Sequence, residues 1–239
     1  MRALTWNLAS KDGVSGKGQR QRQKIADLHA DVLVLTEASM TVVPDNFDSS
    51  TSSEISGSEP EACFAIVAAI KLRSLRVPEL PMGAAALVTH GEVTWLVVGS
   101  CMPWRWDAPP WPPDAAPLEA SGPEAWLYVL NQLDLALSRL RSEYPDLPVL
   151  VAGDFNQTLT GYIVGSLEGR ERLRELLTRH DLVAFTEASP SALPACPSVD
   201  HLCAKSSEGD PVVWLANRTS PTPDDDLTHH AGYLVEVVP

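Results

Sequence analysis

Short, almost uninterrupted apolar runs constrain the fold of this chain more than any other feature of its sequence. Three of them are DVLVLTE at 31–37, CFAIVAAI at 63–70 and VLVAGD at 149–154. Each run has the length and the aliphatic content of a strand that is buried on both faces, and each is too short for a typical helix. A sheet built from such strands needs other elements to cover both of its faces.

Segments with helical periodicity lie between these runs and supply the cover. The sequence QRQRQKIADLHA at 19–30 predicts a helix with Ile25 and Leu28 on its inner face. From Pro123 onward, leucines recur at helical spacing and predict one long amphipathic helix. A further helix is expected across 165–180. Apolar strands that alternate with amphipathic helices predict an α/β layered sandwich.

The remaining segments complete what we expect to be a single domain over residues 1–239. The alternating start of the chain predicts a strand over 2–8, and Ser-, Pro- and acid-rich residues 44–60 predict a surface loop. Residues 103–117 hold six prolines and three tryptophans, and therefore predict a rigid loop. Further strands are expected at 62–70, within 84–102, and near 182–185, 198–204, 212–216 and 232–238.

The charge of the chain limits the partners that it can bind. The formal net charge is −13, whereas proteins that grip long nucleic acid usually gain affinity by neutralising phosphates with Lys and Arg. A local basic cleft or a divalent cation can reverse the repulsion at one site. Long duplex DNA is therefore a less favoured partner than a short or single-stranded nucleic acid.

The cysteines and the apolar segments bear on the location of the protein. Cys63, Cys101, Cys196 and Cys203 form no CxxC pair, which favours reduced thiols in a cytosol over a disulfide scaffold or a structural zinc site. The start MRALTWNLAS has too few apolar residues for a signal sequence. The longest apolar run falls well short of the roughly 18 residues that a membrane span needs. We expect a cytoplasmic protein without a membrane span.

Polar residues stand at or near the ends of several apolar strands. Each has an ordinary explanation when taken alone, such as a cap, a turn, a structural acid or a surface histidine. Together they predict a shared polar pocket, because charged groups beside buried strands carry a desolvation cost unless they are paired, protonated or bound to metal. The set consists of Asn7, Glu37, Asp154, Asn156, Asp200, His229 and His230.

Six segments that contain these residues resemble the motifs of the endonuclease/exonuclease/phosphatase superfamily of metal-dependent phosphohydrolases. They are LTWNL, DVLVLTE, CMPWR, AGDFNQ, SVDHL and LTHH, and they occur in the family's order between residues 4 and 230. The resemblance implies a four-layered α/β sandwich, in which two mixed β-sheets are flanked by helices. It also implies a site at one edge of the sheets.

The resemblance implies a divalent metal cation, Mg²⁺ or Mn²⁺, as the cofactor. Glu37 would be its principal carboxylate ligand, with Asn7 beside it, and hard oxygen ligands suit such ions. The family usually has Asp before its final His, where this chain has His229. Imidazole is a softer and neutral ligand, which shifts the preference of the site toward Mn²⁺ or Zn²⁺ or weakens metal binding.

The same resemblance implies catalytic roles for four residues. Asp154 would orient or deprotonate the attacking water, and Asn156 would hold a phosphate oxygen or help to place that water. His230, oriented by Asp200, would stabilise charge on the phosphoryl group or assist proton transfer. In-line displacement at phosphorus needs such fixed groups and no covalent intermediate.

Two functions from different classes follow from these features. The first is a metal-dependent phosphoesterase that acts on a phosphodiester or phosphomonoester substrate. The alternative is a catalytically impaired relative that binds a phosphate ligand or a protein, because His229 and Ala9 stand where the family usually or often has an acidic residue. In addition, Cys101 and Met102 precede Pro103, where the family usually offers Tyr or His. Trp104 and the tryptophans that follow it either rim the pocket and stack on the substrate or pack the loop onto the body.

Overall fold

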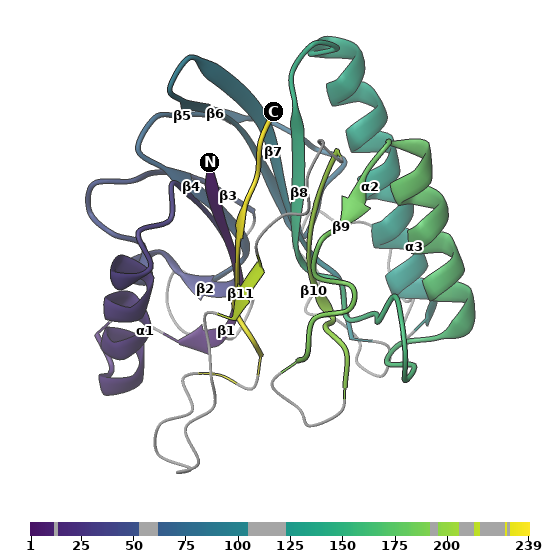
Figure 1. Ribbon diagram of the computed structural model, residues 1–239, viewed down its shortest axis with the longest axis horizontal. Coiled ribbons are helices and arrows are strands. Elements are labelled where there is room, and N and C mark those ends of the chain that lie inside the picture. The colour runs from purple at the N-terminus through teal and green to yellow at the C-terminus, as the bar shows by residue number, and fades with distance from the viewer. Residues whose placement is uncertain are drawn as a thin grey trace.

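The computed structural model describes most of the chain. The described part comprises residues 1–11, 14–52, 62–104, 123–191, 196–205, 213–215, 228 and 230–239. Within it, two six-stranded mixed sheets lie face to face (Figure 1). None of the helices described is long and apolar enough to cross a membrane.

The second sheet is formed by six consecutive strands, and the first sheet is formed by the strands that precede and follow them in the sequence. The first sheet contains, in spatial order, β11 (Val213–Leu215), β12 (Tyr233–Glu236), β1 (Arg2–Lys11), β2 (Val32–Ser39), β4 (Ala62–Ala69) and β3 (Asp48–Thr51). The second contains β5 (Leu72–Leu75), β6 (Gly83–His90), β7 (Val93–Cys101), β8 (Val149–Asp154), β10 (Asp200–Ala204) and β9 (Val183–Ala184).

Helices cover the outer face of each sheet, and a core of small aliphatic residues fills the space between the sheets. Helix α1 (Gly16–Asp27) lies beside the first sheet, next to the 3-10 turn η1 (Met40–Val42), and buries Ile25 against Trp6 and Leu8. Helices α2 (Pro123–Glu143) and α3 (Leu167–Arg179) cover the second sheet (Figure 1). The order helix, sheet, sheet, helix confirms the four-layered α/β sandwich.

Helix boundaries follow the capping residues more closely than the apolar periodicity. Helix α1 begins three residues before the expected position because Ser15 caps it, accepting a hydrogen bond from the backbone N–H of Gly18 at 3.0 Å. Ser166 caps α3 in the same way through the N–H of Gly169 at 2.9 Å. The glycines near the start of α1 gave no apolar signal, so the pattern alone placed its beginning too late.

The prediction of a surface loop over 44–60 is wrong at residues 48–51, and its part from 53 to 60 lies outside the described residues. Residues 48–51 form β3, which pairs with β4 in antiparallel fashion. Ser50 is buried there and donates a hydrogen bond to the carbonyl of Ala85 in the other sheet at 2.9 Å. The strand consists mainly of residues with short hydroxyl side chains, so its sequence has no apolar periodicity that would predict a strand. Of the rigid loop expected at 103–117, the described residues include only the first two.

Strand direction gathers the polar strand ends at one end of the molecule. Strand β1 runs parallel to β2, and β7 runs parallel to β8, so the carboxyl ends of each pair point the same way. Strands β10 and β12 run antiparallel to β8 and β1, and therefore begin at that same end. The amino and carboxyl termini lie at the opposite end (Figure 1).

Two leucines of the long helix α2 allow the packing of the outer layer to be tested. Leu133 on α2 is fully buried, whereas Leu135 on the same helix is 57% exposed. We expect Leu133→Ala to lower the free energy of unfolding by about 2–5 kcal/mol, because the substitution leaves a cavity beneath the helix. Leu135→Ala should change it by less than about 0.5 kcal/mol. Urea denaturation followed by circular dichroism measures both, and equal losses would contradict the assigned layer.

Candidate functional site

The end of β8 is shaped by a glycine that no other residue can replace without moving the backbone. Gly153 has φ of 141°, and a Cβ placed on it would lie 1.9 Å from the carbonyl oxygen of Ser100 in the neighbouring strand β7. The close approach of these two strands therefore depends on the missing side chain. It sets Asp154 directly beside Cys101 at the ends of the parallel strands.

The chain turns immediately after Asp154 and does not continue as an extended strand. Asn156 has φ of 49°, and its backbone N–H donates to Oδ1 of Asp154 at 2.8 Å. Its side-chain Nδ2 donates to the carbonyl oxygen of Met102, also at 2.8 Å. Gly, Asp and Asn therefore form the turn that these residue types favour. The same turn directs Asn156 to the cavity that Asp154 lines.

Asn7 links the two sheets at the site. Its Nδ2 donates hydrogen bonds to Oε1 of Glu37 at 3.0 Å and to Oδ2 of Asp154 at 2.8 Å. Its Oδ1 accepts from the backbone N–H of Ala9 at 2.9 Å, which fixes the orientation of the amide. Glu37 comes from β2 and Asp154 from β8. Asn7 therefore holds two carboxylates from different sheets in one place.

His230 and Asp200 form a pair on the other side of Asp154. Nδ1 of His230 lies 2.9 Å from Oδ2 of Asp200, and its Nε2 lies 4.0 Å from Oδ2 of Asp154. Burial alone would lower the pKa of His230, but the neighbouring carboxylates of Asp200 and Asp154 outweigh it and raise the pKa to about 10. The imidazole is therefore a cation at neutral pH.

Negative charge nevertheless exceeds positive charge in this cluster. Burial, followed by the negative charge of Asp200, raises the pKa of Asp154 to about 7. Oδ1 of Asp200 is buried and has no hydrogen-bond partner in the part of the chain that the structure describes. Buried carboxylate oxygens carry a desolvation cost that a bound cation offsets. The donor set is rich in oxygen and negative in charge, so it fits a divalent cation.

A cavity of about 380 Å³ opens over these side chains. Of the sequence-predicted residues, Glu37, Asp154, Asn156, Asp200 and His230 line it, and Asn7 is buried behind the two carboxylates that it contacts. Trp104 also lines the cavity and is 37% exposed. His229 and the two later tryptophans of the expected rigid loop lie outside the described residues.

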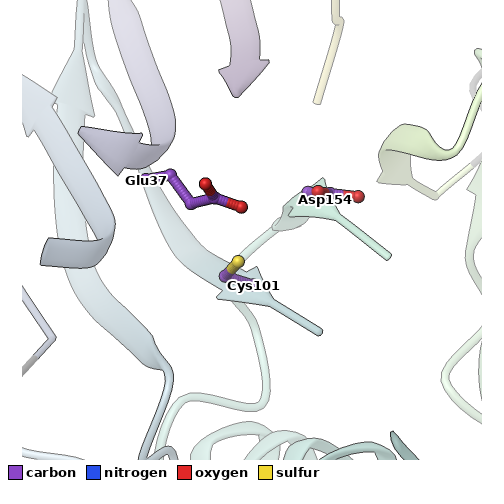
Figure 2. A group of neighbouring side chains, drawn as sticks. All are labelled: Glu37, Cys101 and Asp154. Carbon is purple, nitrogen blue, oxygen red and sulfur yellow. The ribbon is translucent and has the colours of Figure 1, made fainter. Parts of the chain in front are cut away.

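The sequence presents Cys101 as a departure from the family's middle motif, and the structure places its thiol beside two carboxylates of the candidate site. Its Sγ and one carboxylate oxygen each of Glu37 and Asp154 all lie within 4.8 Å of one another (Figure 2). The signal that could have found it was its place at the end of an expected strand. A second group with the same spacing, Asp154, Asp200 and His230, shares Asp154 with the first.

Two facing mixed sheets between layers of helices, with an acidic cavity at one end, define the class of fold. The chain matches no protein-family sequence model and no curated protein sequence. Its fold is similar to that of the AP endonuclease LMAP from Leishmania major, with a TM-score of 0.66 and 13% identity over 98% of this chain and 86% of that one.

Two further solved structures have the same architecture. The 3′ phosphatase NExo from Neisseria, bound to a product DNA hairpin, has a TM-score of 0.63 and 16% identity over 99% of this chain and 98% of that one. An endonuclease/exonuclease/phosphatase from Beutenbergia cavernae has a TM-score of 0.63 and 13% identity over 98% and 70%. The chain therefore has the endonuclease/exonuclease/phosphatase fold, as the sequence motifs indicated.

The raised pKa of His230 predicts how stability depends on pH. Because the folded pKa, about 10, exceeds the unfolded value of about 6.5, the stabilisation is fully present below pH 6.5 and is lost as the pH rises toward 10. The raised pKa of Asp154 also makes the free energy of unfolding fall as the pH rises, but this loss is complete near pH 7. In EDTA, the free energy of unfolding should therefore fall between about pH 7 and 10.

Two variants distinguish the contribution of His230 from that of other groups whose titration also lowers the free energy of unfolding in this pH range. His230→Asn should reduce the pH dependence in this range. His29→Asn changes an exposed histidine whose φ of 48° suits asparagine, and it should leave the dependence as in the wild type. Urea denaturation at several pH values measures the slope, and an unchanged slope in His230→Asn would contradict the assignment.

Proposed function

We propose that this protein is a metal-dependent phosphoesterase, a nuclease or a phosphatase, that hydrolyses a phosphodiester or phosphomonoester by in-line attack of water. The observation that carries the proposal is the convergence of Glu37, Asp154, Asn156, Asp200 and His230 on one cavity. The similar solved structures include an AP endonuclease and a 3′ phosphatase, and both support the same reaction class. They differ in substrate, so they do not choose between the two activities.

Glu37 is proposed as the principal ligand of a divalent cation, Mg²⁺ or Mn²⁺, and His229 as a further donor from the segment before His230. Such a cation, when bound, supplies Lewis-acid stabilisation of negative charge at the phosphoryl oxygens. Asn7 keeps the Glu37 carboxylate in place through its 3.0 Å hydrogen bond, and the same amide holds Asp154. A fixed ligand loses little freedom when it binds the ion.

Asp154 is proposed to orient the attacking water and to accept its proton. A pKa near 7 places this carboxylate at the value at which a general base works well at neutral pH. Asn156 stands beside it and uses one hydrogen of Nδ2 to hold the carbonyl of Met102. The second hydrogen of that amide is proposed to be donated to a phosphate oxygen. Water and phosphate would then be positioned by adjacent residues of one turn.

His230 is proposed to stabilise the charge of the phosphoryl group or to give a proton to the leaving oxygen. Asp200 orients it through Nδ1, which leaves Nε2 directed toward Asp154 and the cavity. Both carboxylates keep the imidazole protonated at neutral pH. A preorganised cation in a partly buried site stabilises developing negative charge more than the same group does in water.

Charge and cavity size set the proposed range of substrates. The net charge of −13 disfavours long duplex DNA, and a cavity of about 380 Å³ accommodates a nucleotide-sized group. We therefore propose a small phosphate ester, or the end or single-stranded part of a short nucleic acid, as the substrate. The free thiols of all four cysteines favour a cytoplasmic location.

Hydrolysis of bis-p-nitrophenyl phosphate and p-nitrophenyl phosphate tests the mechanism. With Mn²⁺ present, Asp154→Asn should lower kcat/KM by about 10²–10⁴-fold, because the substitution removes the proposed base. EDTA should abolish the wild-type activity. Asp45→Asn, which changes a highly exposed carboxylate, is the matched control and should retain full activity. Activity that survives both chelation and Asp154→Asn would refute the mechanism.

The alternative function is a phosphate-ligand or protein-binding module with an impaired site. Ala9, in place of a residue that is often acidic, and His229, in place of the usual Asp, are the features that favour it. His229→Asp distinguishes the two functions in the same assay. A large gain from a near-zero baseline would favour the impaired module, whereas little change or a loss would favour a working variant site.

A further inference from the structure

The thiol of Cys101 lies where the two sheets direct their carboxylates. Cys101 ends β7, is paired in register with Asp154 at the end of the parallel strand β8, and faces Glu37 from β2. Figure 2 shows its sulfur directed into the space between the two carboxylates. The three ligand atoms lie within 4.8 Å of one another, close enough to meet around one cation after small side-chain movements.

A purely apolar role does not account for this cysteine. A free cysteine usually behaves as a small hydrophobe, and Cys101 does extend the core cluster that α2 and α3 cover. However, Cys101 is 3% exposed, and burial together with the charges of Glu37, Asp154 and Asp200 raises the pKa of its thiol well above the usual range. A residue packed only for its apolar character has no reason to turn its sulfur toward the carboxylates of Glu37 and Asp154, whereas a cation held between these groups would favour the thiolate.

A separate observation at the cavity that Glu37 and Asp154 line also indicates a bound cation. Asp200 lines this cavity. Its Oδ1 is buried and has no hydrogen-bond partner among the described residues. A buried carboxylate oxygen of this kind normally meets a donor or a metal ion. The thiol and the orphaned oxygen are on different strands, β7 and β10. Asp200 belongs to the neighbouring group with Asp154 and His230, so the two observations meet at Asp154, which both groups share.

We propose that Cys101 is a sulfur ligand of the cation, so that Glu37, Cys101 and Asp154 form a site that prefers thiophilic divalent ions such as Zn²⁺ and Co²⁺ over Mg²⁺. The proposal deepens the metal site of the proposed function and rests on that site, but not on hydrolysis. When the ion binds, the S–H bond breaks, a metal–sulfur bond forms and the proton passes to solvent, without any change of oxidation state. These three donors leave a further coordination position, which His229 or the substrate can occupy.

The hydrogen bonds of Asp154 are compatible with this role. Its Oδ1 accepts from Asn156 and its Oδ2 from Asn7, and each carboxylate oxygen has a further lone pair that can bind a cation. Oxygen-only sites favour Mg²⁺ and Mn²⁺, whereas one thiolate shifts the preference toward softer ions. The cysteine that the sequence motif presents as the loss of a phosphate contact thus becomes the determinant of metal choice.

Cobalt spectroscopy of the full chain tests the proposal without an activity measurement. The protein is stripped with EDTA, kept reduced and titrated with Co²⁺. The wild type should show a thiolate-to-cobalt charge-transfer band in the near ultraviolet, and Mg²⁺ should displace the ion only in large excess. Cys101→Ser should abolish the band and weaken cobalt binding at least about 10-fold. Cys196→Ser removes a different thiol, one that lines the cavity together with Glu37 and Asp154, and it should retain the band.

A second measurement needs no variant, in case Cys101→Ser does not fold. Zinc X-ray absorption of the wild-type protein should find one sulfur at about 2.3 Å from the metal. Only oxygen and nitrogen neighbours, no binding of Co²⁺, or a band that disappears in Cys196→Ser and not in Cys101→Ser would each overturn the proposal. A sulfur-ligated ion without hydrolysis would uphold the site and defeat the proposed function. Manganese-dependent hydrolysis without a sulfur ligand would do the reverse.

Discussion

The close packing of the two sheets is the constraint on which the site depends. Glu37 belongs to one sheet and Asp154 to the other, so the distance between the sheets sets the distance between these carboxylates. Small residues fill that interface: a Cβ on Gly99 would lie 3.0 Å from a methyl group of Val34. Larger side chains would separate the sheets, and the 3.0 Å and 2.8 Å hydrogen bonds of Asn7 to the two carboxylates could not both persist.

The strand ends that carry the site also carry backbone strain. Ala9, Glu37 and Asn156 have φ of 54°, 44° and 49°, a left-handed conformation that asparagine tolerates but that costs residues such as Ala9 and Glu37 about 1–3 kcal/mol. Two of them belong to the candidate site, and the third holds the amide of Asn7. This conformation directs side chains away from the strand faces and into the cavity. This backbone conformation therefore lowers the free energy of unfolding, but it also places polar side chains at the candidate site.

Local pattern predicted most of the elements and the residues that line the cavity of the candidate site, but not their spatial relations. Apolar runs located β2, β4 and β8, and polar residues at strand ends identified Glu37, Asp154 and His230. Nothing near Asp48–Thr51 signals β3, because that strand owes its place to pairing with β4. The proximity of Cys101 to Glu37 could not be predicted either, since it arises from two sheets packing face to face. Contacts of that kind depend on long-range geometry, whereas periodicity reports only the local conformation.

The electrostatics of the site and of the whole chain act in opposite senses on a phosphate substrate. Three carboxylates, Glu37, Asp154 and Asp200, meet a single imidazolium, His230, in a chain with a net charge of −13. Such a field repels a phosphate dianion but concentrates divalent cations. In the proposed enzyme, one cation would bring the charge of this cluster close to zero. Metal binding would then be a condition for substrate entry as well as for chemistry, and the substrate would bind weakly to the metal-free protein however well its shape fits.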